Sequence, residues 1–193
     1  MRLVLVTDRR LMGADFGAAI ARAVSIVGAD AIVQVREKDL GGAALLALVR
    51  AAIAAARPFG ARVVVNDRID VALAAGADGV HLPENGLSIS AARALLPRGA
   101  IVGASRHTPA DAAACDADLV ILGPIFETPG KGPPLGAASL AAARGSASLV
   151  AIGGIDSGER ARVCFTAGAN AVAAIRAVWT APDAARAAAA LIA

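Results

Sequence analysis

The sequence contains no tyrosine, and its only aromatic residues are four phenylalanines and Trp179. A nucleic-acid surface depends on clustered basic residues and on aromatic side chains that stack on bases, and neither stands out in this chain. The 19 Lys and Arg residues are dispersed, and with 16 Asp and Glu residues they leave a formal charge of only +3. We therefore expect no nucleic-acid partner, while small anionic ligands remain open.

Cysteines and long apolar runs are also scarce. Cys115 and Cys164 stand alone, without the spacing of a zinc site or a disulfide framework, which fits a reducing compartment. Hydrophobic residues make up 57% of the chain, but Ala supplies much of this share. No window approaches the ~18 uninterrupted apolar residues of a membrane span. Residues 1–8 start like a strand and reach an acid too early for a secretory signal. The sequence predicts a soluble cytoplasmic protein without a membrane partner.

Short β-rich runs alternate with Ala-rich helical stretches along the whole chain. The β-rich runs are nearly continuous apolar segments, typical of a parallel sheet that is covered on both faces. No Pro/Gly-rich linker divides the chain, so eight strand–helix units predict a single (β/α)8 TIM barrel domain over residues 1–193. An open doubly wound sheet is the alternative.

The predicted strands are Leu3–Thr7, Ala31–Val35, Arg62–Val65, Gly79–Leu82, Ala100–Gly103, Leu119–Leu122, Leu149–Ile152 and Ala171–Ile175. The predicted helices lie near residues 16–27, 42–57, 68–75, 88–96, 109–115, 137–143, 157–167 and 182–192.

A row of polar side chains closes the second predicted strand. Because side chains alternate along a strand, Gln34, Arg36 and Lys38 share one face, while Val35 and Glu37 take the other. Arg offers a planar fork of donors and Lys a compact charge, and this combination suits phosphate or pyrophosphate. The plainer alternative is a polar strand end that runs into solvent.

Polar residues also follow most of the other predicted strands. A (β/α)8 barrel keeps its chemistry at the carboxyl ends of its strands, so their shared position predicts one site. Taken singly, Asp67 is more often a helix N-cap than a metal ligand. The residues at these strand ends are Thr7–Arg10, Asn66–Asp67, His81–Asn85, Ser105–Thr108, the Gly/Pro-rich stretch 123–132, Gly153–Gly154 and Ile175–Arg176.

The last two strand ends suit a phosphate group. Gly153 and Gly154 carry no side chains, so a ligand can approach their backbone N–H groups closely. Ile175 and Arg176 lie where the start of a following helix adds amides and a dipole. The loops after strands seven and eight are the usual phosphate position in such barrels. A simple tight turn is the alternative for the glycine pair.

Seven stretches in order along the chain carry a resemblance to a known family. They are residues 5–10, 34–38, 65–68, 79–82, 102–108, 123–128 and 151–155. Together they resemble the thiamine-phosphate synthase and thiazole tautomerase (TenI) superfamily. A synthase joins hydroxymethylpyrimidine diphosphate to thiazole phosphate and releases pyrophosphate. A tautomerase isomerises a thiazole carboxylate phosphate, which requires an acid–base group and no metal.

The resemblance implies a role for each candidate residue. In a synthase the diphosphate leaves first, and Mg²⁺ and fixed cations stabilise its charge while the thiazole nitrogen captures the pyrimidine cation. The implied catalytic residues are Arg36, Lys38, Ser105 and Lys131, with Gln34 and Asn66 also binding the pyrimidine diphosphate. The implied thiazole phosphate site consists of Thr128, Gly153, Gly154, Ile175 and Arg176, and the implied Mg²⁺ ligand is Asp67.

Three positions depart from the synthase pattern. Gly86 stands where synthases carry a second Mg²⁺-binding Asp, which predicts a weakened metal site with Glu84 as a candidate substitute. Gly130 replaces a second lid Thr, and the usual Tyr of strand one is absent. The tautomerase pattern is also poorly matched, because Pro124 replaces its His. We expect a synthase, with a tautomerase or a non-catalytic thiamine-precursor binding or regulatory protein as alternatives, and leave a homo-oligomer open.

Overall fold

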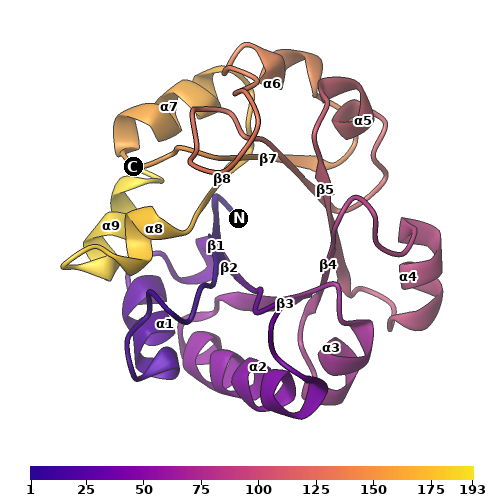
Figure 1. The fold of residues 1–193 in the computed structure, drawn as a ribbon, viewed down its shortest axis with the longest axis vertical. Helices are drawn as coiled ribbons and strands as arrows, with labels where there is room; N and C mark the ends of the chain where they lie inside the picture. The colour runs from indigo at the N-terminus through magenta and orange to yellow at the C-terminus, as the bar shows by residue number, and fades with distance from the viewer.

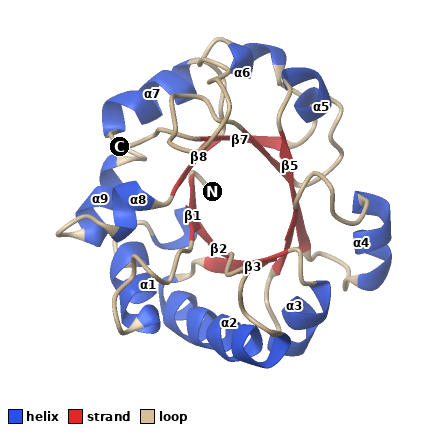
Figure 2. Ribbon diagram, in the orientation of Figure 1, coloured by secondary structure: helices blue, strands red, loops and turns tan.

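Residues 1–193 are described by a computed structural model, in which eight parallel strands close into a barrel in sequence order. Strand β8 pairs with β1 and completes the ring, and helices surround it (Figures 1 and 2). The predicted (β/α)8 barrel is confirmed, and the open-sheet alternative is wrong. The strands are β1 (Leu3–Val6), β2 (Ala31–Val35), β3 (Arg62–Asn66), β4 (Gly79–Leu82), β5 (Ile101–Arg106), β6 (Leu119–Leu122), β7 (Ser148–Ile152) and β8 (Ala171–Ala174).

Every predicted helix is present, several of them shorter than expected at their ends. The short helix α8 directly after β8 and two 3-10 turns were not predicted. The helices are α1 (Phe16–Val24), η1 (Gly28–Asp30), α2 (Gly42–Ala56), η2 (Arg57–Phe59), α3 (Ile69–Ala75), α4 (Ile89–Leu95), α5 (Pro109–Ala113), α6 (Ser139–Ala142), α7 (Gly158–Thr166), α8 (Arg176–Trp179) and α9 (Ala184–Ala190).

Strand β5 differs most from its predicted bounds. It continues beyond Gly103 to Arg106, because Ser105 and Arg106 pair with the apolar residues Ile121 and Leu122 of β6. The polar character of these residues reads as a loop in the sequence, but a neighbouring strand satisfies their backbone groups. Ser105 is therefore held on a strand.

Alternation along the strands separates two apolar clusters. The smaller cluster contains inward residues such as Val4, Ile32 and Val64, and fills the barrel. The larger cluster contains the residues between them, such as Leu5 and Val33, and lies between the barrel and its helices. The two layers support the strands rigidly from both sides, so side chains at the strand ends start from fixed positions.

A repeated hydrogen bond secures the amino ends of the barrel. The polar residue that enters each of β4, β6 and β8 uses its side-chain oxygen to accept a backbone N–H of the preceding strand. The three bonds join the N–H of Val63 to Asp78 (2.7 Å), that of Val102 to Asp118 (2.7 Å) and that of Leu149 to Asn170 (2.8 Å). This end of a barrel serves stability, whereas the carboxyl ends carry function.

Helix α2 and its 3-10 extension, residues 42–59, form a segment long and apolar enough to cross a membrane by length and composition alone. A helix that covers a barrel passes the same test. One face of α2 is buried and includes Leu45, Val49 and Ile53, and the helix contacts β2, β3 and its neighbours α1 and α3. This spacing is that of an amphipathic helix packed on a protein core.

Candidate active site

The strand register brings polar residues of β2 and β3 together inside the barrel mouth. Gln34 pairs with Val64, and Asn66 lies two residues further along β3 on the same face. Nε2 of Gln34 donates to Oδ1 of Asn66 at 3.2 Å, and Gln34 is only 3% exposed. A buried amide needs such a partner. Two residues assigned to one pocket from sequence are therefore in contact.

The next two strands add a second polar pair. Nε2 of His81 lies 2.8 Å from Oγ of Ser105, and the ring fits because Gly103 has no side chain, since a Cβ there would lie 2.6 Å from Nδ1. His81 is 2% exposed. Burial, and to a smaller extent the charges of Arg36 and Arg106, lower the pKa of His81 to about 3. The imidazole is therefore neutral near pH 7 and fixes the Ser105 hydroxyl.

The three cations expected to meet a diphosphate lie on two loops. Arg36 is half-buried just beyond the end of β2, and Lys38 is exposed in the turn that follows. Lys131 belongs to the loop between β6 and α6, which lies beside β7 and β8 in Figure 1. None of the three forms an ion pair with a carboxylate. They remain available to an anionic ligand.

Asp67 occupies a tight turn directly after β3. It is the only non-glycine residue with a positive φ, at 66°. Its N–H donates to the carbonyl of His81 at 2.9 Å, and the N–H of Arg68 donates back to Asn66 at 2.8 Å. Arg68 is the N-cap of α3 and pairs with Asp70, so the N-cap alternative for Asp67 is wrong and its exposed carboxylate has no partner. Such a backbone conformation is typical of a functional position.

The carboxylates near the mouth decide whether a metal ion fits. Oε2 of Glu84 lies 2.9 Å from Nδ1 of His107, so this candidate ligand already has a partner. No three Asp, Glu, His or Cys side chains converge. Mg²⁺, however, usually binds through one or two carboxylates plus substrate phosphates. The free carboxylate of Asp67 fits a metal ion that is shared with a diphosphate, and the residues present do not form a protein-only cage.

The carboxyl ends of the neighbouring strands β7 and β8 carry free backbone amides. Gly153 and Gly154 have φ values of 99° and 65°, which favour glycine. Their N–H groups and that of Ile175, the residue before α8, donate to no acceptor in the protein. Backbone donors are normally paired, so unpaired amides at a strand end indicate room for an external acceptor.

The β6–α6 loop packs directly on this glycine pair. A Cβ at Gly153 would lie 2.7 Å from Cα of Pro124 and 3.1 Å from Oγ1 of Thr128. The N–H of Phe126 also donates to the carbonyl of Gly153 at 3.0 Å. Thr128 is therefore next to the glycine pair, as the expected site requires. The same contacts mean that any side chain at Gly153 disturbs the loop.

Trp179 fastens helix α8 beneath these amides. Its Nε1 donates to the carbonyl of Val6 at the end of β1, at 2.7 Å, and the ring is buried. Because Trp179 is the only tryptophan and the chain has no tyrosine, its fluorescence reports on this region alone.

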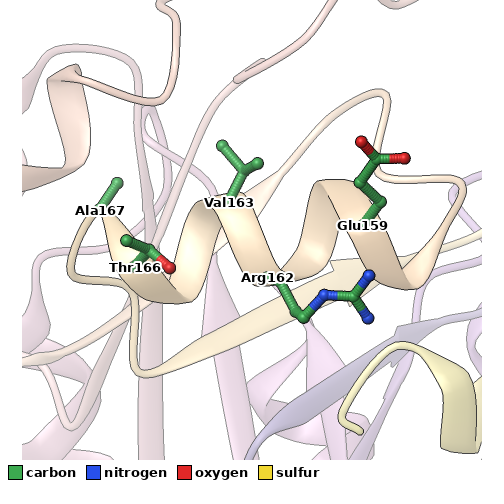
Figure 3. A pocket seen from close by; sticks show the side chains of 5 residues that line it. All are labelled: Glu159, Arg162, Val163, Thr166 and Ala167. Carbon is green, nitrogen blue, oxygen red and sulfur yellow. The ribbon is translucent and has the colours of Figure 1, made fainter.

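A broad, open hollow lies along α7 (Figure 3), a helix on the outside of the barrel (Figure 1). Its lining comes from one helix and the residue that follows it, and Glu159 and Arg162 point apart in the figure. The hollow has no convergent polar groups, which a binding site requires. We do not count it as a candidate site.

Fold and mouth together define a class: a (β/α)8 barrel whose carboxyl end gathers unpaired cations, the free carboxylate of Asp67 and free backbone amides. Residues 3–178 match the family described as thiamine monophosphate synthase. The chain belongs to this family, as its motifs suggested.

Known relatives cover almost the whole chain. A thiamine-phosphate synthase of Methanoculleus marisnigri is 44% identical over 184 residues, which are 91% of this chain and 86% of the relative. A thiamine-phosphate synthase of Azorhizobium caulinodans is 39% identical over 191 residues, covering 95% and 89%. The solved structure of thiamine phosphate pyrophosphorylase from Pyrococcus furiosus superposes with a TM-score of 0.86 at 29% identity, covering 99% and 93% of the two chains.

Two groups that contact the predicted site residues were given no individual role from the sequence. His81 was only one of several residues at the predicted strand ends, and its partner Ser105 lies 24 positions away. Glu37 was placed on the face opposite to Gln34 and Arg36, and no partner was assigned to it. The only sign of Glu37 in the sequence is that an acid stands at a position that continues the apolar residues on the outer face of β2.

Proposed function

We propose that this protein is a thiamine-phosphate synthase that condenses hydroxymethylpyrimidine diphosphate with thiazole phosphate, giving thiamine phosphate and pyrophosphate. The observation that carries the proposal is that two groups of residues suited to bind phosphate groups lie on different sides of the same barrel mouth. Unpaired cations and a free carboxylate lie at one end, including Arg36 and Asp67. Free amides lie at the other, including Gly153 and Ile175. A reaction between a diphosphate and a phosphate needs both.

The first step breaks the C–O bond between the pyrimidine methylene and the diphosphate, and the electron pair leaves with pyrophosphate. Arg36 and Lys38 stabilise the negative charge that develops, and Lys131 reaches it from the loop after β6. The hydroxyl of Ser105 donates to a pyrophosphate oxygen. Neutral His81, 2.8 Å from that hydroxyl, supports its orientation.

Asp67 holds Mg²⁺ together with the diphosphate in this proposal. When bound, the ion supplies neutralisation of the leaving group's charge. Glu84 joins only if it gives up its hydrogen bond to His107. With Asp67 as the only implied ligand that has no partner, the protein alone would bind Mg²⁺ weakly, and a bound diphosphate would supply further ligands.

The second step forms the C–N bond, as the lone pair of the thiazole nitrogen attacks the pyrimidine methylene carbon. Gln34 and Asn66 hold the pyrimidine ring through their amide groups. The thiazole phosphate fixes the attacking nitrogen near the cation, which is a proximity contribution. Its proposed contacts are Thr128, Gly153, Gly154, Ile175 and Arg176, where free amides support the assignment.

The test mixes both phosphorylated halves with and without Mg²⁺ and measures thiamine phosphate by chromatography. We expect product only with both halves and the metal. Metal-independent isomerisation of a thiazole carboxylate phosphate would instead identify a tautomerase. Binding of either half without turnover, measured by calorimetric titration, would identify a precursor-binding protein. We further propose a cytoplasmic location, with small phosphorylated substrates and neither nucleic acid nor membrane as partners.

A further inference from the structure

A buried acid lies directly between the two cations at the end of β2. Glu37 is only 6% exposed, and alternation places it on the outer face of the barrel wall, in line with Val33 and Val35. Charged side chains are rarely buried unless they are paired, because removing a carboxylate from water is costly. Its position therefore requires a structural explanation.

Three hydrogen bonds from the end of β1 satisfy Glu37. Its Oε1 accepts from Oγ1 of Thr7 at 2.7 Å and from the backbone N–H of Arg9 at 3.0 Å. Its Oε2 accepts from Nη1 of Arg9 at 3.0 Å. Both carboxylate oxygens are thus used within the protein.

The Thr7 hydroxyl connects Glu37 to the backbone of Arg36. The backbone ladder between β1 and β2 ends where the N–H of Thr7 donates to the carbonyl of Gln34 at 2.9 Å. The next donor, the N–H of Arg36 just beyond the end of β2, bonds instead to Oγ1 of Thr7 at 3.0 Å. Since the same oxygen donates to Glu37, the side chains continue the ladder beyond the strand. The side chain of Arg36 is thereby kept on the same face as Gln34.

A second acid, which is exposed, follows Lys38. Asp39 accepts two hydrogen bonds from Arg9, both at 2.7 Å, and one from Arg10 at 2.8 Å. The hydrogen bonds from Arg9 hold the pKa of Asp39 well below its usual range. Lys38 is therefore flanked by two acids, Glu37 and Asp39, that share the guanidinium of Arg9.

We propose that Glu37 is a positioning residue that fixes Arg36 and Lys38 for the diphosphate group, an inference that rests on the proposed function. It touches no ligand and acts through Thr7 and Arg9. A bidentate guanidinium contact depends on geometry, so loss of this support weakens diphosphate binding. Electrostatics alone predicts the opposite, because removing an anion near two cations strengthens their attraction for a diphosphate.

Two variants and one control separate these effects. Glu37→Gln keeps the shape but turns an N–H group toward Arg9, and Thr7→Val removes the hydroxyl without changing the volume. We expect each to weaken binding of inorganic pyrophosphate with Mg²⁺ by ~10- to 100-fold, the range of a hydrogen bond to a charged group. The control Asp39→Asn removes the same charge from an exposed ion pair. It should change the affinity by less than about fivefold.

The closing experiment is calorimetric titration of inorganic pyrophosphate with Mg²⁺ into the parent, the three variants, Arg36→Ala and Arg36→Ala/Glu37→Gln. If Glu37 acts in part through Arg36, the loss of affinity in the double variant is smaller than the sum of the losses in Arg36→Ala and Glu37→Gln. Unchanged thiazole phosphate binding, reported by Trp179 fluorescence, shows that Glu37→Gln is folded.

The positioning role is overturned if Glu37→Gln binds pyrophosphate as tightly as the parent or more tightly, or if its loss adds fully to that of Arg36→Ala. It is also overturned if Asp39→Asn loses as much, or if the parent binds no pyrophosphate. These outcomes do not depend on turnover. If pyrophosphate binding by the parent depends on Glu37 but the parent makes no thiamine phosphate, only the proposed function is refuted.

Discussion

Replacing His81 with glutamine should make the free energy of unfolding depend less steeply on pH below neutrality. The folded protein keeps this ring neutral, since burial lowers its pKa from 6.5 to about 3. The resulting stability is fully present above the unfolded pKa and is lost as the pH falls toward the folded pKa. Between about pH 7 and about pH 4 the parent should lose about 3 kcal/mol through this residue alone. A glutamine amide cannot titrate, and it keeps a polar group near Ser105.

The assay is urea unfolding of the parent and His81→Gln at several pH values in this window. The difference in the free energy of unfolding between the two proteins should change by about 3 kcal/mol across it. Carboxylates titrate in both proteins and cancel in the difference. His107→Gln is the matched control, because it removes the other histidine, which is exposed. Parallel pH profiles for the parent and His81→Gln would refute the reasoning.

Three further changes test other parts of the mouth. Arg36→Ala should lower kcat/KM for thiamine phosphate formation by ~10- to 100-fold, through loss of one charge-assisted contact; unchanged kinetics would exclude the contact. Gly153→Ala should lower Tm more than Gly130→Ala, because both positions have positive φ but only Gly153 faces atoms as close as 2.7 Å; equal Tm losses would contradict this packing. Asp67→Asn should abolish Mg²⁺-dependent turnover, while Trp179 fluorescence should still report thiazole phosphate binding. Full activity of this variant would show that Asp67 does not bind Mg²⁺.

The fold could be predicted because each strand is a short apolar run bounded by turn residues, and eight of them alternate with helices. The barrel's interior and exterior follow from the period of two, as at Ile32 and Val33. Strand ends were less certain where pairing overrides composition. Ser105 and Arg106 continue β5 because β6 offers partners, and no local pattern reveals that partner.

Contacts within the site were beyond local patterns for the same reason. The sequence pointed to Gln34 and Asn66 through their place at strand ends, and the register then joins them. It gave no sign that Thr7 reaches Glu37, because that contact spans 30 positions and depends on where two strands stop. The positive φ of Asp67 is likewise imposed by the turn around it.

The departure from the synthase pattern at Gly86 has a steric side that the structure reveals. The sequence revealed a missing carboxylate at this position. The structure adds that a Cβ at Gly86 would lie 2.9 Å from Cδ of Pro83. The loop after β4 is closed around a glycine, so an aspartate there must move Pro83 before it can act as a ligand.

The most direct test of the proposed synthase activity is the simultaneous measurement of pyrophosphate and thiamine phosphate in one reaction. The parent protein receives both phosphorylated halves and Mg²⁺, and each half is omitted in turn. The account predicts equimolar release of the two products, with no thiamine phosphate when either half is missing. Pyrophosphate without thiamine phosphate in the complete reaction, or neither product at any Mg²⁺ concentration, would contradict it.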